Sequence, residues 1–196
     1  MDPRDVVLQT LTPTVMVPKF GAFKALETPG HRFLVAADGL WLEIRRAWLY
    51  ARMPITTKRG SVPIPCGELT PCLELKFGKV PRALLSKFVE QAKADLPNES
   101  AAAIIWNERT EEMRLQPLEA VRAGPGHITF NQPSLEDGEH LVVDLHSHAT
   151  TPAFFSGTDN RDDRTAIKVA GVVGDLDKQD PTYAFRLCAL GTFITL

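Results

Sequence analysis

The chain has 196 residues, of which 44% are hydrophobic and 23% are charged, and its formal net charge at pH 7 is -2. This is the composition of a soluble globular protein, and no apolar run approaches the roughly 20 residues that span a bilayer. Lys and Arg form no basic block, which argues against a dedicated nucleic-acid binder, and the first residues lack the layout of a signal peptide. We therefore expect a cytoplasmic protein, with three reduced, structural cysteines and with neither membrane nor nucleic acid as partner.

Residues 1–80 are expected to form a strand-rich N-terminal region of unknown role. Short apolar or alternating runs, separated by Pro and Gly, predict strands. These runs cover residues 6–11, 32–37, 39–51 and 72–77. The third run carries Trp41, Trp48 and Tyr50, which form either a binding face or, more commonly for such side chains, part of the core.

Residues 81–196 are expected to form a second domain with a different pattern. After Pro81, apolar residues that recur every three to four positions predict a helix over 82–96. A second helix is expected over 162–169, where acidic residues lie near its N-terminal end. Apolar or alternating runs predict strands over 100–108, 113–121, 140–148, 170–176 and 183–196. The order of these elements predicts the α/β (α+β) class, with a mixed sheet flanked by helices.

The strand expected over 140–148 ends in His146-Ser147-His148. Residues two apart on a strand share a face, so both imidazoles point the same way and Ser147 points oppositely. Two such imidazoles can converge on one metal ion, but a hydrogen-bonded pair of strand histidines has the same pattern. The segment DLHSH is also similar to the opening motif of barrel-type metal-dependent phosphoesterases and amidohydrolases. Only 48 residues follow His148, which is too few for a barrel of about 250 residues.

The spacing beyond the histidines is more specific. Seven residues separate His148 from Ser156, and two more separate Ser156 from Asp159, which gives HxH-x7-S-x2-D. This string resembles the JAMM motif of the MPN+ (Mov34-type) zinc metallopeptidases, and the resemblance covers about residues 81–196. It implies the MPN fold, a zinc ion held by His146, His148 and Asp159, and hydrolysis of a peptide or isopeptide bond, often after the C-terminus of a ubiquitin-like protein.

The same family requires an upstream glutamate, and Glu99, just before an apolar strand, fits that position. The competing glutamates are Glu68, Glu74 and Glu108. By this resemblance Glu99 would move a proton from water to the leaving amine, and Ser156 would donate a hydrogen bond to the oxyanion. The chain departs from the family at Ala149, where proline is common.

Four segments, one of which contains this motif, together resemble the bacterial family of PRTRC system A proteins. They cover residues 39–48, 88–107, 140–163 and 186–193. This resemblance extends over nearly the whole chain and implies a peptidase that works beside a ThiF-like (E1-like) protein, with a ubiquitin-like protein or its conjugates as substrate. A non-catalytic MPN scaffold that recruits such partners is the alternative.

Three residues near the motif, Asp144, Phe154 and Phe155, each have two possible interpretations, and other residues are expected to be solvated or at the surface. Asp144 either orients a histidine from behind or is an ordinary strand-edge carboxylate. Phe154 and Phe155 either line a substrate groove or pin the loop onto the core. Asp162 and Asp163 are expected to be solvated residues at a helix start. The remaining histidines, His31, His127 and His140, are expected at the surface.

Overall fold

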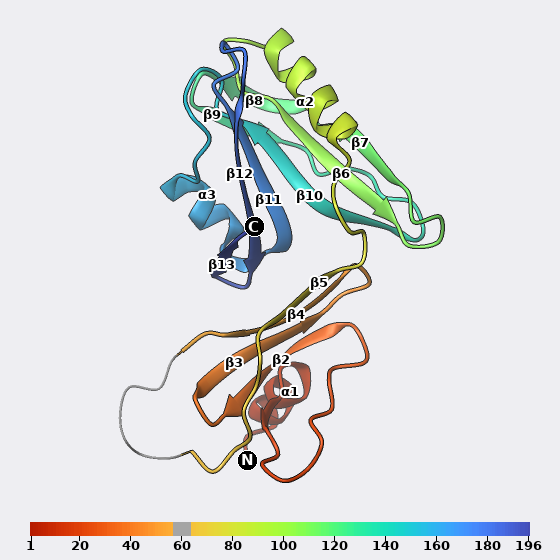
Figure 1. Cartoon of the computed structure of the whole chain (residues 1–196), viewed down its shortest axis with the longest axis vertical. Coiled ribbons are helices and arrows are strands. Elements are labelled where there is room, and N and C mark those ends of the chain that lie inside the picture. Colours follow the sequence, from red (N-terminus) through yellow and green to blue (C-terminus); the bar gives the residue numbers. More distant parts are fainter. Residues whose placement is uncertain (57–63) are drawn as a thin grey trace. The chain divides into compact units, whose positions relative to one another are not determined.

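The computed structural model describes residues 1–56 and 64–196, and the chain divides into two compact units, Met1–Lys76 and Phe77–Leu196. Each unit has its own sheet (Figure 1). Among the described residues, no helix is long and apolar enough to cross a membrane.

The first unit is a five-stranded sheet with the strand order β1-β2-β3-β4-β5, preceded by one helix. Strands β1 and β2 are parallel, and the other neighbours are antiparallel. The elements are α1 (Pro3–Leu11), β1 (Thr14–Met16), β2 (Gly30–Ala36), β3 (Gly39–Arg45), β4 (Leu49–Pro54) and β5 (Cys72–Leu75). Trp41, Trp48 and Tyr50 are buried, so the interpretation of these aromatic residues as core is confirmed.

The strand expected over residues 6–11 is wrong, because these residues belong to helix α1. Asp2 is the N-cap and accepts a hydrogen bond from the backbone N of Arg4 (2.8 Å), and Pro3 stands at the start of the helix. A capping carboxylate followed by proline is a helix start signal. None of the residues of this helix is buried. The apolar run over residues 6–11 is therefore not the sign of a buried strand.

The second unit is built on a six-stranded mixed sheet with the order β13-β12-β11-β10-β6-β7, beside a separate hairpin, β8-β9. Helix α2 packs against β6 and β7 and buries Phe88 and Ala92. The elements are α2 (Arg82–Ala94), β6 (Ala101–Asn107), β7 (Met113–Pro117), β8 (Ala120–Gly124), β9 (His127–Phe130), β10 (Glu139–Ser147), α3 (Gly157–Asp162), a 3-10 turn η1 (Asp163–Thr165), β11 (Ile167–Gly174), β12 (Thr182–Ala189) and β13 (Thr192–Thr195). The expected class, a mixed α+β sheet with flanking helices, is confirmed.

The pairing of β10 with β11 explains how distant residues meet. These two strands are parallel neighbours, and parallel strands require a connection that crosses back over the sheet. Helix α3 lies in this connection, so it returns to the end of β10. The helix expected over 162–169 is wrong, because α3 begins earlier, at Gly157, and β11 has begun by Ile167.

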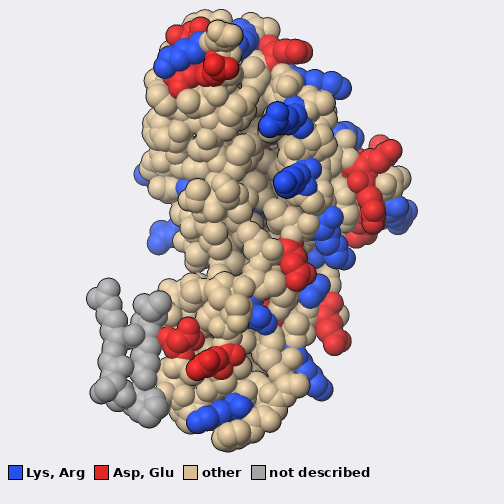
Figure 2. Space-filling view, viewed as in Figure 1, with Lys and Arg blue, Asp and Glu red and all other residues tan. Residues whose placement is uncertain are grey.

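Charged side chains are dispersed on the surface of the described residues that Figure 2 shows. Blue Lys and Arg side chains are interspersed with red Asp and Glu and with neutral residues, without a continuous basic patch on this face. This face therefore presents no concentrated positive charge.

Candidate metal centre

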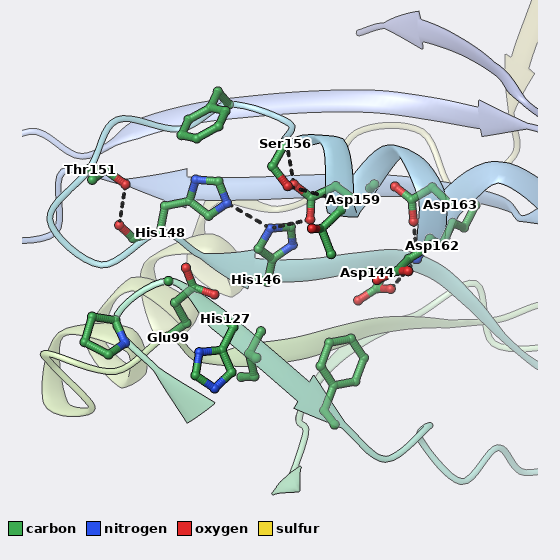
Figure 3. Close-up of a pocket in the computed structure, with 18 residues that line it drawn as sticks. Glu99, His127, Asp144, His146, His148, Thr151, Ser156, Asp159, Asp162 and Asp163 are labelled. Carbon is green, nitrogen blue, oxygen red and sulfur yellow. Dashed lines mark hydrogen bonds and ion pairs between the residues drawn. The ribbon is translucent and has the colours of Figure 1, made fainter. Parts of the chain in front are cut away.

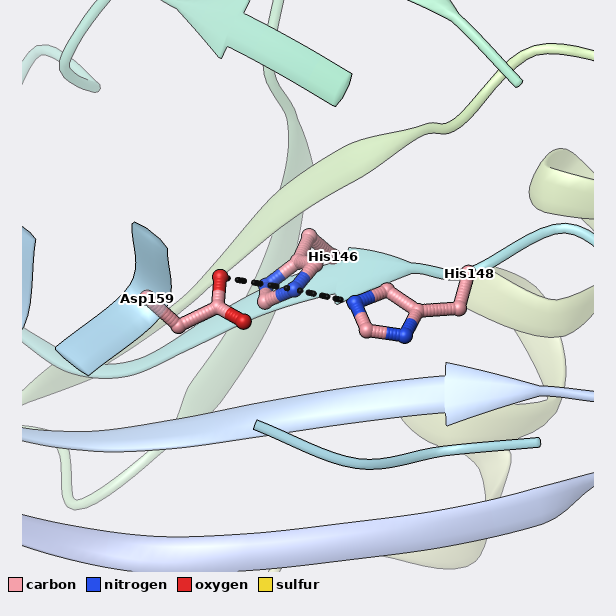
Figure 4. Close-up of side chains that lie close together, drawn as sticks. All are labelled: His146, His148 and Asp159. Atoms are coloured by element: carbon pink, nitrogen blue, oxygen red, sulfur yellow. Dashed lines mark hydrogen bonds and ion pairs between the residues drawn. The ribbon is translucent and has the colours of Figure 1, made fainter. Parts of the chain in front are cut away.

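Three potential ligands converge beside the C-terminal end of β10. The Nε2 atoms of His146 and His148 lie 3.2 Å apart, and His146 Nε2 lies 3.3 Å from Asp159 Oδ1 (Figure 4). One ligand atom from each residue can be chosen so that all three lie within 4.8 Å of one another. The structure thus brings together the three residues that the sequence predicted as ligands.

The geometry and chemistry of this group fit zinc. Two ligand atoms bound tetrahedrally to one zinc ion at 2.0–2.1 Å lie about 3.3–3.4 Å from each other, close to the distances that His146 makes. Burial lowers the pKa of His146, and burial together with the neighbouring His146 lowers the pKa of His148. A lowered pKa favours the neutral imidazole, which is the form that binds metal.

Asp159 is oriented by the N-terminus of α3. Ser156 is the N-cap, and its Oγ accepts a hydrogen bond from Asp159 N (3.2 Å), while Ser156 N donates to Asp159 Oδ2 (2.6 Å). This reciprocal capping box fixes the carboxylate and leaves Oδ1 for His146 and for a metal ion. Since the cap uses Ser156 Oγ as an acceptor, its hydroxyl proton remains available for donation.

Glu99 lies in the link between α2 and β6 and is held there by its backbone. Its N–H donates to Gly124 O (3.1 Å), and the next residue, Ser100, donates its N–H to Ser147 Oγ (2.8 Å). Ser147 therefore points away from the histidines, as the strand alternation predicts. The Glu99 side chain points into the pocket beside His148 (Figure 3), and the residue is only 7% exposed. Burial, with a smaller contribution from the Asp159 charge, raises the pKa of Glu99 to about 7.

Because its pKa is raised, the ionised Glu99 side chain is expected to destabilise the folded protein. In the metal-free protein, Glu99→Gln should raise the free energy of unfolding at pH 8 by about 2–3 kcal/mol, and by much less at pH 5. Because the folded-state pKa of about 7 exceeds the ordinary value of 4.5, the folded state binds more protons between these values, and stability falls as the pH rises through them. Urea unfolding at both pH values measures the effect.

The control for this experiment is Glu90→Gln on the exposed side of α2. We expect its unfolding free energy to follow the wild-type pH dependence. If the Glu99→Gln and wild-type curves run parallel between pH 5 and pH 8, the burial argument for Glu99 fails.

The loop after β10 is anchored by backbone hydrogen bonds at His148 and at Ala149. His148 N donates to Val173 O (2.8 Å), and Leu176 N donates to Ala149 O (2.9 Å). Ala149 is buried and has a φ of 44°, whereas proline is fixed near -65°. Alanine in place of the family's common proline is therefore consistent with a backbone conformation that proline cannot adopt. Ala149 is not one of the three candidate metal ligands.

A close approach between the loop and β11 requires glycine at position 174. A Cβ on Gly174 would lie 2.2 Å from Thr151 O and 2.4 Å from Ala153 N. This contact lays the loop along β11 on its way to Ser156, and it is a local reason for a glycine in the run of residues 170–176.

The ligands line a pocket of about 480 Å³ together with Glu99 and Ser156 (Figure 3). Phe154 is half exposed and meets His148 edge-to-face, with the ring centroids 4.7 Å apart. It lines the pocket, whereas Phe155 packs on Arg186. The two phenylalanines thus divide between the two interpretations that the sequence left open.

Sequence reasoning missed the contribution of the β8-β9 hairpin to this pocket. Three residues of β9 line this pocket, His127, Ile128 and Phe130. His127 is exposed, as expected, but it belongs to a strand facing the pocket. The turn signal Gly124-Pro125-Gly126 between two short runs could have revealed the hairpin, although not its position over Glu99.

Two aspartates differ from their expected surroundings. Asp163 is 5% exposed and pairs with Lys168 (2.8 Å) and Arg186 (2.6 Å), so its interpretation as a solvated residue is wrong. Asp144 pairs with Lys168 (2.5 Å) and makes no hydrogen bond to His146. It is thus neither an exposed strand-edge carboxylate nor a direct partner of the imidazole. Asp162 is exposed, as expected.

The fold and the site together define a mixed α+β domain with a His-His-Asp group at the end of a central strand. The sequence model for prokaryotic homologs of the JAB domain matches residues 81–188, more than half of the chain. The protein belongs to this family, so the expected JAB/MPN membership is confirmed. A second model, a domain of unknown function (DUF2016), matches residues 2–76.

Solved structures include a protein that is similar to part of this chain. It is the solution structure of a protein from Desulfitobacterium hafniense, with 18% sequence identity and a TM-score of 0.47, covering 59% of this chain and 86% of that one. The comparison with curated proteins finds no match.

Proposed function

We propose that the protein is a zinc-dependent metallopeptidase or isopeptidase of the JAMM type. One observation carries the proposal: three ligand atoms lie within 4.8 Å of one another, in a pocket that Glu99 and Ser156 also line. A hydrogen-bonded histidine pair alone would need neither the carboxylate at 3.3 Å nor a second, buried carboxyl group nearby.

Each residue would have a distinct task. His146, His148 and Asp159 would hold the zinc ion, which would supply Lewis-acid chemistry by activating a water molecule and polarising the scissile carbonyl. Glu99 would accept a proton from the attacking water and deliver it to the leaving amine, for which a pKa near 7 is well suited. The Ser156 hydroxyl would donate a hydrogen bond to the oxyanion.

We further propose a ubiquitin-like protein, or a conjugate of one, as substrate, and a ThiF-like protein as functional partner. The resemblance of residues 39–48, 88–107, 140–163 and 186–193 to PRTRC system A proteins supports this assignment. The apolar side chains of Ile128, Phe130 and Phe154 line the pocket beside the candidate ligands, which suits an extended peptide segment.

The proposal is tested with two substrates: a ubiquitin-like protein fused through its C-terminus to a reporter, and an isopeptide-linked conjugate of the same protein. We expect cleavage of at least one, loss of cleavage after treatment with a chelator, and recovery when zinc is restored. Cleavage that is equal with and without the chelator would contradict a metal-dependent reaction.

A non-catalytic scaffold is the alternative outcome of the same experiment. In that case the protein would bind zinc, or no metal, and would retain the ubiquitin-like protein or its ThiF-like partner without cutting either substrate. The buried Glu99 argues for catalysis, since a scaffold gains nothing from a carboxyl group whose burial opposes its ionisation.

A further inference from the structure

We infer that Arg186 is a positioning residue for the metal centre, which holds the Ser156–Asp159 segment where the Asp159 carboxylate meets His146. The inference rests on the proposed zinc site and adds a residue outside the ligand set. Helix α3 carries the candidate ligand Asp159, yet no hydrophobic side chain of this helix is buried against the sheet.

Helix α3 has six residues, and none of them is buried. Hydrophobic packing, the usual way in which a helix docks on a sheet, is therefore absent here. The capping box fixes Asp159 relative to Ser156, but both belong to the same segment. It does not fix that segment relative to β10, which carries the histidines. A contact outside this segment must therefore set the distance between the Asp159 carboxylate and the histidines of β10.

Arg186 on β12 makes contacts on both sides of the segment. Its guanidinium carbon lies 3.8 Å from the ring centroid of Phe155, and its Nη1 donates a hydrogen bond to Asn160 Oδ1 (2.5 Å). Phe155 immediately precedes Ser156, and Asn160 immediately follows Asp159. One buried side chain thus brackets the segment that supplies the carboxylate ligand and the hydroxyl.

A chain of ion pairs connects the same arginine to β10, the strand that carries the histidines. Its Nη2 donates to Asp163 Oδ2 (2.6 Å), and Lys168 Nζ lies 2.8 Å from Asp163 Oδ1 and 2.5 Å from Asp144 Oδ2. Asp144 lies on β10, two residues before His146. Four buried or half-buried charges, two of each sign, therefore connect β12, η1, β11 and β10.

The shape of arginine is essential to this arrangement. The guanidinium lies between the rings of Phe155 and Phe193, with its carbon 3.8 and 4.0 Å from their centroids, while its edge donates to two acceptors. A planar fork can stack and donate at once, whereas the ammonium of lysine is a point charge that cannot. We therefore expect Arg186→Lys to be a poor substitute.

The test measures zinc affinity in the full chain, by competition with a chromophoric chelator. Arg186→Met keeps the length of the side chain and removes the fork. We expect it to weaken zinc binding by about 10–100-fold, the usual loss when a residue that supports a ligand is removed. We also expect an altered visible absorption spectrum of the cobalt-substituted protein, which a purely structural role elsewhere would not change.

Arg114→Met is the matched control. Arg114 makes a two-pronged pair with Glu139 at the other end of β10 (2.7 Å for both contacts), so its loss also breaks an arginine–carboxylate pair in the same sheet. We expect wild-type zinc affinity and a wild-type cobalt spectrum from this variant. Arg186→Lys should resemble Arg186→Met more than wild type.

If Arg186→Met does not fold, Asn160→Ala decides the question, because Asn160 is exposed and its loss removes one acceptor of Arg186 only. Weaker zinc binding by Asn160→Ala supports the inference, and unchanged binding overturns it. Unchanged binding by a folded Arg186→Met overturns it directly.

Hydrogen exchange in the metal-free protein separates this inference from the proposed function. The Asp159 amide, which donates to Ser156 Oγ, should exchange faster in Asn160→Ala and in a folded Arg186→Met than in wild type, whether or not zinc binds. A wild-type chain that binds no zinc would sink the proposed metal centre. Unchanged exchange in both variants would sink the positioning role of Arg186.

Discussion

Glu99→Gln is expected to lower the rate of hydrolysis by about 10²–10⁴-fold, the usual contribution of a positioned general base, while the zinc content stays that of wild type. Glutamine has nearly the same shape as glutamate, but its amide cannot accept and pass on a proton. Glu99 is outside the His-His-Asp group, so the metal ligands should be unaffected. The rate is measured on the reporter fusion, and the metal content by mass spectrometry.

Glu108→Gln is the control for this experiment. In the sequence, Glu108 is an alternative candidate for the general base. The structure places its carboxylate 3.3 Å from His140 and not among the residues that line the pocket. We expect this variant to cleave at the wild-type rate. Undiminished cleavage by Glu99→Gln would remove Glu99 from the mechanism, and loss of zinc in that variant would assign it to the ligands instead.

His148→Ala should release the zinc ion and, with it, a rate contribution of about 10³-fold or more, because a metal that polarises a carbonyl supplies several kcal/mol of transition-state stabilisation. His148 is chosen over Asp159 because it takes no part in the capping box. The measurements are zinc content after dialysis and the zinc-dependent rise in melting temperature, which mass action gives to any protein that binds metal only when folded.

The comparison variant is His127→Ala, which removes a histidine from the same pocket without touching the His-His-Asp group. It should keep one equivalent of zinc and the full zinc-dependent rise in melting temperature. If His148→Ala also keeps both, the three clustered residues are not the metal site, and the proposed function loses its foundation.

The parts of this site that are local in the sequence could be predicted from it. The two-residue spacing of His146 and His148 on a strand places both on one face, and the same alternation points Ser147 to the opposite face, where it accepts a hydrogen bond from Ser100 N. The position of Glu99 between a helix and a buried strand was also readable, because the periodicity changes there from helical to strand-like.

The parts that depend on tertiary contacts could not be read in this way. The sequence places the second helix at Asp162 and Asp163 because acidic residues favour a helix start, but the capping box at Ser156 begins it five residues earlier. Asp163 is then free to pair with Lys168 and Arg186 from two other strands. Nothing in the spacing of these residues shows that they meet, since only the strand order brings them together.

The capping box at the start of α3 has a thermodynamic consequence. Asp159 offers Oδ2 to the helix and Oδ1 to the candidate metal site, so one side chain takes part in two equilibria, the winding of a six-residue helix and the capture of an ion. If zinc binds better when the helix is formed, linkage requires that helix formation strengthen zinc binding by the same free energy. Such a short helix has little stability of its own, so zinc binding would stabilise the formed α3 further, and removal of zinc would lower that stability.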